Sequence, residues 1–261
     1  MKKILSAAVL LPLVLISLGG CNSAPDQLLE QTVEQTVKIE PNASVSIRNT
    51  DGSIYIYGST GDELKIQAKK KAYRQDRLDK IAVNIKSQPD LVSIDTVYPP
   101  KAKFSFSDRS GTVDYVITLP QTCSITRADL SNGEIVLQGM RGKTVRASLV
   151  DGRLIERNCF SDVQVLVGNG SLDVLYDWWE KTPVAVDAKI VSGNTRAFIP
   201  GKASFHLLAG TSTGDIANDF AEKADRRGQK ITKLDTFVGA ASDSEIKLQA
   251  TSGDIRIAES N

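Results

Sequence analysis

The chain of 261 residues is poor in the side chains that most often build catalytic and metal centres. It has one histidine, two methionines, two tryptophans and three cysteines, and aromatic residues make up 6% of it. One histidine cannot build a multi-histidine metal site, and no serine lies in a G-x-S-x-G turn. We therefore expect no catalytic residues, no metal and no cofactor, and we expect His206 to be an exposed residue on the outer face.

An excess of charge of either sign is also missing. The sequence has 32 Lys+Arg against 31 Asp+Glu, and loss of Lys2 and Lys3 with a leader would leave a net charge near −1. A nucleic-acid-binding protein needs a basic surface to neutralise phosphates, so nucleic acid is excluded as an expected partner. With 41% hydrophobic and 24% charged residues, the rest of the chain is typical of a globular protein.

The long apolar run of the sequence lies at its start. Residues 4–18 are apolar apart from two serines and a proline, they follow two lysines, and Gly19 and Gly20 come directly after them. This order is typical of an export signal, and the run is shorter than the ~20 apolar residues of a spanning helix. We expect residues 1–20 to be a signal peptide that is removed.

The end of this signal, Leu18-Gly19-Gly20-Cys21, looks like the lipobox of bacterial lipoproteins. The resemblance implies that the Cys21 thiol is lipidated and that acyl chains hold the protein at a membrane of the cell envelope. Asn22 in place of an aspartate favours the outer membrane if the organism is Gram-negative. The alternative is an ordinary secretory peptide that happens to end near a cysteine.

Residues 21–43 are rich in Gln, Glu and Thr and contain two prolines. We expect them to be the lipidated cysteine and a tether between membrane and domain. From residue 44 to residue 261 the sequence alternates apolar and polar residues between glycines, which predicts strands in a single all-β domain.

A small polar residue followed by glycine recurs along this domain. Successive glycines from Gly133 to Gly214 are separated by 19, 18, 23 and 21 residues, and the last interval, of 39 residues, corresponds to two periods with one marker missing. A period near twenty predicts stacked units. The markers are Gly52, Gly133, Gly152, Gly170, Gly193, Gly214 and Gly253.

Apolar residues recur at fixed distances from these glycines, seven, five and three residues before and two after. A spacing of two is the period of a strand, so these positions predict columns that face inward. We expect a parallel β-solenoid of about 20 residues per turn, with a β-sandwich as the alternative. The column seven residues before the glycine is Val45, Thr126, Val145, Val163, Val186, Leu207 and Ile246.

The turns at residues 130–135, 213–216 and 251–255 resemble the repeated T-x-S-G-D-[IV] units of the putative-adhesin domain family of bacteria. That family has β-solenoid repeats and no established common activity, so the resemblance implies adhesion by analogy only. The pattern fails after Gly152 and Gly193, where Arg153 and Asn194 replace the aspartate.

Cys123 and Cys159 occupy similar positions two turns apart. Two turns separate backbones by roughly 9.5 Å, beyond the ~7 Å limit for a disulfide. We expect both thiols to be unpaired and at least partly buried, with a disulfide between them as the alternative if the corners of the turns shift the register.

Two aromatic segments are candidate binding surfaces. Tyr176, Trp178 and Trp179 fall in a long turn, where they could hold a sugar ring or a partner, or cover a widened turn of the core. Phe104 and Phe106 could lie on a projecting binding loop or on a hairpin that covers the first turn.

These features favour a lipid-anchored, non-catalytic and adhesin-like protein that presents a binding surface to an envelope or extracellular protein or glycan. A periplasmic scaffold or envelope-sensing accessory, and a carbohydrate-active enzyme on the same scaffold, are the alternatives.

Overall fold

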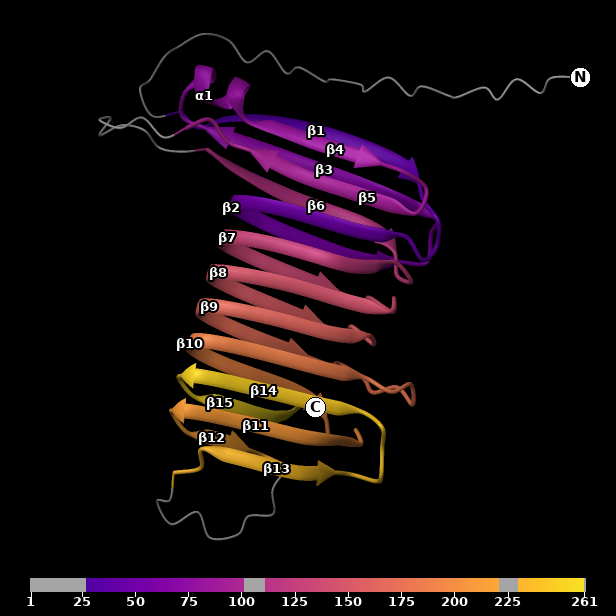
Figure 1. Cartoon of the computed structure of the whole chain (residues 1–261), viewed down its shortest axis with the longest axis vertical. Helices are drawn as coiled ribbons and strands as arrows, with labels where there is room; N and C mark the ends of the chain where they lie inside the picture. The colour runs from indigo at the N-terminus through magenta and orange to yellow at the C-terminus, as the bar shows by residue number, and fades with distance from the viewer. Residues whose placement is uncertain (1–26, 101–110, 221–229, 261) are drawn as a thin grey trace, which may run out of the picture.

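The protein is all-β, as the sequence predicted. The structure, a computed structural model, describes residues 27–100, 111–220 and 230–260, which form one sheet with both parallel and antiparallel strand pairs (Figure 1). The one helix of these residues, α1 (Gln75–Lys80), has six residues, and no helix among them is long and apolar enough to cross a membrane.

The centre of the molecule is a stack of parallel strands. Long strands bend sharply at a glycine and double back, so that their two halves form two layers that meet at one edge (Figure 1). The stacked strands are β2 (Ser44–Ser59), β7 (Ser124–Gln138), β8 (Thr144–Arg157), β9 (Asp162–Leu175), β10 (Ala185–Pro200), β14 (Glu245–Ser252) with β15 (Ile255–Ser260), and β11 (Phe205–Thr213) with β12 (Ile216–Asn218).

Strands with antiparallel partners lie at both ends of the stack. They are β1 (Leu29–Lys38), β3 (Glu63–Ala72), β4 (Ala82–Ser87), β5 (Leu91–Val97) and β6 (Thr112–Pro120) at one end and β13 (Lys233–Val238) at the other. β3 pairs antiparallel with β1 and β6, β4 with β5, and β13 with β11. β5 and β6 also pair with β2, in parallel.

The glycines predicted to mark the turns do lie in one column. Gly52, Gly133, Gly152, Gly170 and Gly193 are register partners on consecutive stacked strands, with φ between 126° and 136°. An added Cβ at Gly133 would lie 1.7 Å from the carbonyl oxygen of Gly52. Glycine is therefore required at this edge both by the positive φ and by the close approach of the next turn.

The inward columns face each other between the two layers and form the core. Each apolar side chain that is removed from water there stabilises the fold by about 1.5–3 kcal/mol, and stacking makes this burial continuous along the molecule. The fully buried members include Val45, Ile47, Ile54, Ile56, Ile135, Leu154, Val163, Leu172, Leu207, Ile246 and Leu248.

One position of the predicted columns is displaced. A register shift at the start of β7 pairs Val45 with Ile125 and Ser46 with Arg127. Ile125 is the buried residue of this column, and the bulged Thr126 instead donates its hydroxyl hydrogen to the carbonyl oxygen of Val45 at 3.2 Å. The assignment of Thr126 to an inward column was wrong because a bulge changes the alternation by one residue.

The order of the last turns also differs from the expectation. Gly253 pairs into the column between Gly193 and Gly214, because β14 lies between β10 and β11 (Figure 1). The long interval before Gly253 is therefore not an unmarked turn of the stack. The chain leaves the stack after β12, adds β13 antiparallel to β11, and returns to insert β14 and β15.

The expected tether is partly wrong as well. Residues 29–38 are β1, whose ten residues pair antiparallel with β3 from Leu29↔Ala72 to Lys38↔Glu63. Val33 and Val37 pack against the core. The content of Gln, Glu and Thr suggested a polar linker. In the structure Gln and Val alternate with Glu and Thr along a strand, and the face with Gln and Val is half-buried against the domain.

Candidate functional site

The aromatic candidates differ in where their side chains lie. Trp178 is 47% exposed, whereas Tyr176 is 1% exposed. Tyr176 therefore cannot contact a ligand directly, which corrects its place among the surface candidates, and its buried hydroxyl donates to the carbonyl oxygen of Cys159 at 2.9 Å. Phe104 and Phe106 lie outside the described residues.

Trp179 is half-buried and rests on other rings. Its ring centroid lies 5.3 Å from that of Tyr176, in an edge-to-face arrangement, and 5.6 Å from that of Phe205. Rings at these separations hold one another in place and add about 0.5–1.5 kcal/mol per pair beyond their burial. Tyr176 and Phe205 therefore fix the orientation of the Trp179 indole.

The Trp178 indole is fixed by polar contacts instead. Its Nε1–H donates to Glu180 Oε1 at 2.9 Å, and Arg141 donates to both Glu180 oxygens at 2.5 and 2.6 Å. The Arg141 guanidinium lies over the Phe160 ring, 5.1 Å from its centroid. The hydrogen bonds from Arg141 hold the pKa of Glu180 below its ordinary value, so Glu180 is a carboxylate whose charge is already neutralised.

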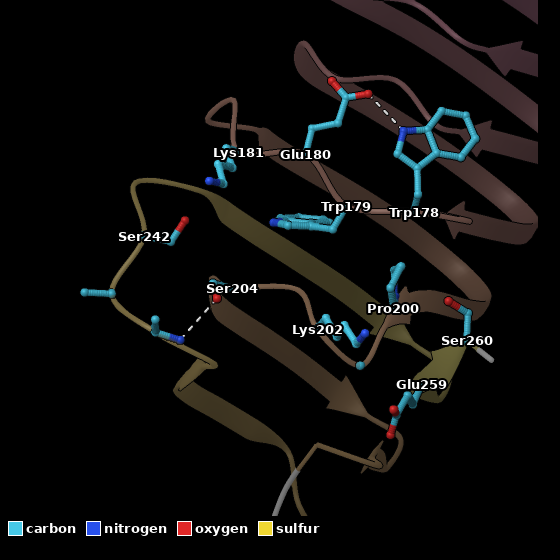
Figure 2. A pocket seen from close by; sticks show the side chains of 13 residues that line it. Trp178, Trp179, Glu180, Lys181, Pro200, Lys202, Ser204, Ser242, Glu259 and Ser260 are labelled. Atoms are coloured by element: carbon cyan, nitrogen blue, oxygen red, sulfur yellow. Dashed lines mark hydrogen bonds between the residues drawn. The ribbon is translucent and has the colours of Figure 1, made fainter.

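A hollow of about 980 Å³ lies beside these two tryptophans. Four parts of the chain border it: the turn between β9 and β10, the turn after β10, residues 240–242 before β14, and the end of β15. In Figure 2 the Trp179 ring faces this hollow, whereas the Trp178 ring turns toward Glu180. We name it the aromatic hollow and define it by Trp178, Trp179, Lys181, Lys202, Ser204 and Ser242.

The rim of the aromatic hollow is rich in hydrogen-bond donors. Ser204 Oγ accepts the backbone N–H of Ala240 at 3.1 Å, and Ser242 Oγ accepts that of Ser244 at 3.1 Å. Each hydroxyl keeps its own hydrogen to donate. Lys181 and Lys202 are exposed and form no ion pair with another described residue.

The sequence pointed to the two tryptophans but to none of the other residues of the aromatic hollow. Lys202 and Ser204 follow Trp179 by more than twenty residues, and Ser242 follows it by more than sixty. They meet because β14 enters the stack next to β10, and the repeat gave no sign of that insertion. No local motif in the sequence marks these three residues.

Three other hollows lie on the sides of the stack. One pair, of about 440 and 450 Å³, meets at Gly210, where an added Cβ would contact nothing within 4 Å. A third, of about 560 Å³, includes Asp114 and Glu134. Ser53 lies between these two carboxylates on the neighbouring strand and donates to Asp114 Oδ1 at 3.1 Å.

Both described cysteines are free and buried, as the sequence predicted. Burial raises the pKa of the Cys123 thiol to about 11 and also raises that of Cys159. Cys159 lies beside Glu156, whose side chain is fully buried at an inward position of β8. Burial raises the pKa of Glu156 to about 8, and its Oε2 has no hydrogen-bond partner.

His206 lies on the outer side of β11, with 24% of its side chain exposed. It stacks on Phe237 with ring centroids 4.5 Å apart, and its Nε2 lies 2.7 Å from Asp235 Oδ1. Asp235 and Glu245 raise the pKa of His206. Among the described residues no three His, Cys, Asp or Glu side chains are grouped to hold a metal ion.

Comparisons with known proteins give a likeness of fold. No protein-family model and no curated protein matches this chain. A crystal structure described as a putative cell adhesion protein from Clostridium sporogenes has a TM-score of 0.50 and 15% identity, over 88% of this chain and 100% of that one. A putative adhesin from Bacteroides fragilis has a TM-score of 0.33 and 10% identity, over 87% of this chain and 97% of that one. The chain therefore shares its fold with a solved bacterial protein named for cell adhesion.

Proposed function

We propose that this chain is a non-catalytic, adhesin-like binding protein of the bacterial cell envelope that holds its ligand in the aromatic hollow. The observation that carries this proposal is the Trp179 indole, which is held by Tyr176 and Phe205 and faces an open hollow with donors on its rim. Binding sites are concave, apolar or aromatic, and equipped with a few directed polar groups, and the aromatic hollow has each of these properties.

In this proposal the stacked turns form a parallel β-solenoid that serves as a rigid support. Each turn pairs its backbone with the turns on both sides, so the residues at one corner keep their positions. Turns that follow β9 and β10 supply Trp179 and Lys202, and residues before β14 supply Ser242. The ligand would therefore meet a preformed site.

Attachment to the membrane is the second part of the proposal. Lipid on Cys21 would hold the protein at the outer membrane of a Gram-negative cell, or at the envelope membrane of another bacterium. β1 begins at Leu29, so the chain between lipid and domain spans at most about 25–30 Å. The domain would lie close to the bilayer, and its partners would be the membrane itself and an extracellular or envelope ligand.

A carbohydrate-active enzyme is a second candidate, favoured by one observation. Asp114 and Glu134 lie on either side of Ser53 in one hollow, two strand spacings apart. An inverting glycosidase uses two carboxyl groups that lie roughly 6.5–9.5 Å from each other. Release of reducing ends from a saccharide by the natural protein, but not by Glu134→Gln, would support this candidate.

Two measurements test the main proposal. Fractionation and protease shaving of intact cells compare the natural protein with Cys21→Ser. We expect the natural protein to be membrane-bound and removed by external protease, and the variant to be soluble. A membrane-bound protein that resists shaving would instead support a periplasmic scaffold or sensor, and a variant that stays bound would contradict the lipid anchor.

The second measurement is binding of saccharides by Trp179→Leu and by the natural protein. Leucine keeps apolar volume against Tyr176 and Phe205 but lacks a flat ring face. We expect binding to be lost while the circular dichroism spectrum is unchanged. Phe237→Ala is the control, because Phe237 is 68% exposed and lies outside the aromatic hollow.

A further inference from the structure

We infer that the ligand of the aromatic hollow is a saccharide that carries a carboxylate. This inference rests on the proposed function, because it names the chemical class of ligand for the same site.

The ring favours a saccharide. The Trp179 indole is held in place by Tyr176 and Phe205, and its ring faces the hollow (Figure 2). The C–H-rich face of a sugar ring packs on such a flat surface, and the sugar hydroxyls then point sideways toward polar groups on the rim. A hollow of about 980 Å³ accommodates a short stretch of sugar units. A folded protein partner would instead need a matching surface of roughly 800 Å² on each side.

The free charges favour an anion. Arg141 and Trp178 already bind both oxygens of Glu180. Of the remaining charged residues that line the aromatic hollow, Lys181 and Lys202 are basic and Glu259 is acidic. These three residues give the lining a net charge of +1, and neither lysine forms an ion pair with another described residue.

The hydroxyl groups strengthen the same preference. Ser204 Oγ and Ser242 Oγ each accept a backbone N–H and donate to no described residue, so both hydroxyl hydrogens are free to be donated to a ligand. Two serine donors and two ammonium groups match a group that only accepts hydrogen bonds. A carboxylate is such a group, and hydrogen bonds to a charged acceptor are about twice as strong as neutral ones.

The test compares acidic saccharides with their own uncharged forms. The probes are hexagalacturonate and an oligosaccharide that ends in N-acetylneuraminic acid, each measured beside its methyl ester by isothermal titration calorimetry with the purified full-length protein. We expect at least one acid to bind about three- to tenfold more tightly than its ester at low salt. That preference should shrink at 0.5 M NaCl because salt screens the exposed lysines.

Variants separate the two levels of the proposal. The double variant Lys181→Gln/Lys202→Gln should lose most of the preference for the acid and still bind the ester. Lys86→Gln is the control, because Lys86 is an exposed lysine on β4 at the other end of the molecule. This control should leave the preference for the acid unchanged. Equal binding of acid and ester by the natural protein would overturn this inference and leave the binding site in place. Binding of both that survives Trp179→Leu would overturn the proposed function as well.

Discussion

A Cβ atom added to Gly253 would lie 1.7 Å from the carbonyl oxygen of Gly193, although sixty residues separate the two glycines in the sequence. The backbone of Gly253 therefore packs closely on that of Gly193 in β10. Like the glycines of the consecutive turns, Gly253 has no room for a side chain and has a positive φ, of 137°.

Replacing Gly253 with alanine should lower the free energy of unfolding by about 3 kcal/mol or more, because the new Cβ meets backbone and the φ is unfavourable for any L side chain. Gly210→Ala is the matched control, since its added Cβ meets nothing within 4 Å, and it should change stability by less than about 1 kcal/mol. Urea unfolding measures both. Equal losses in the two variants would contradict the stacking described for Gly253.

Glu156 should make the protein less stable as pH rises. Its folded-state pKa of about 8 lies above the ordinary value of 4.5 because the carboxyl group is fully buried beside Cys159 and Tyr176. Below pH 4.5 both states are protonated and the group has no effect. Between pH 4.5 and 8 the unfolded state loses its proton first, so stability falls by up to about 1.4 kcal/mol per pH unit and by a few kcal/mol in total.

Glu156→Gln should remove this slope, so the variant should be more stable than the natural protein at pH 8 and nearly as stable at pH 4. Thermal unfolding across this pH range measures the effect. Glu63→Gln is the control, because Glu63 on β3 is only partly buried. An unchanged slope in Glu156→Gln would show that another group is responsible.

Asp173 should be the costliest acidic residue to replace on the outer face. Its side chain is 2% exposed and accepts hydrogen bonds from Arg153 and Arg196 on the two neighbouring strands, at 2.7–3.1 Å. Asp173→Asn leaves two guanidinium groups facing a neutral amide and should cost about 2–4 kcal/mol. Chemical denaturation of the purified variant gives this value.

Asp219→Asn is the control for Asp173→Asn. Asp219 pairs with Arg256 at 3.0 Å, but the two side chains are 40% and 54% exposed. Exposed pairs contribute about 0–1 kcal/mol. If both substitutions cost the same, burial of Asp173 is not what makes its ion pairs matter.

The thiols of Cys123 and Cys159 should be inert in the folded protein and reactive after unfolding. The thiolate is the reactive form, and burial raises the pKa of both groups. In the Cys21→Ser protein we expect a thiol reagent to modify neither cysteine under native conditions and both in guanidinium chloride. Mass spectrometry counts the modified thiols, and a mass two hydrogens lower without reagent would reveal a disulfide that the structure does not contain.

The sequence was informative where a physical constraint repeats at every turn. Gly133, Gly152 and Gly170 were predicted to share a column, and they do, because the same close approach recurs at each of them. It was uninformative where a strand leaves the repeat. Thr126 was misplaced by one bulge, and β14 carries the same pattern whichever strand it pairs with.

The candidate site was predictable only in part for the same reason. Trp178 and Trp179 stand together in the sequence, and their pairing in one turn was visible. For Tyr176 the sequence left both a binding surface and a cover over the core open, because the turn that contains it has no alternation. Lys202 and Ser242 come from other turns, and only the strand order brings them to Trp179.

That strand order has a consequence for how the protein is made. β11 and β12 are synthesised before β14 and β15, yet they rest on them and not on β10. During synthesis the edge of β10 stays unpaired until β14 has been made, and an open strand edge can pair with other chains. A chain terminated before residue 245 would therefore not be a shorter stack with intact ends. It would expose the edges of β10 and β11 that β14 and β15 cover in the complete fold, and exposed strand edges promote aggregation.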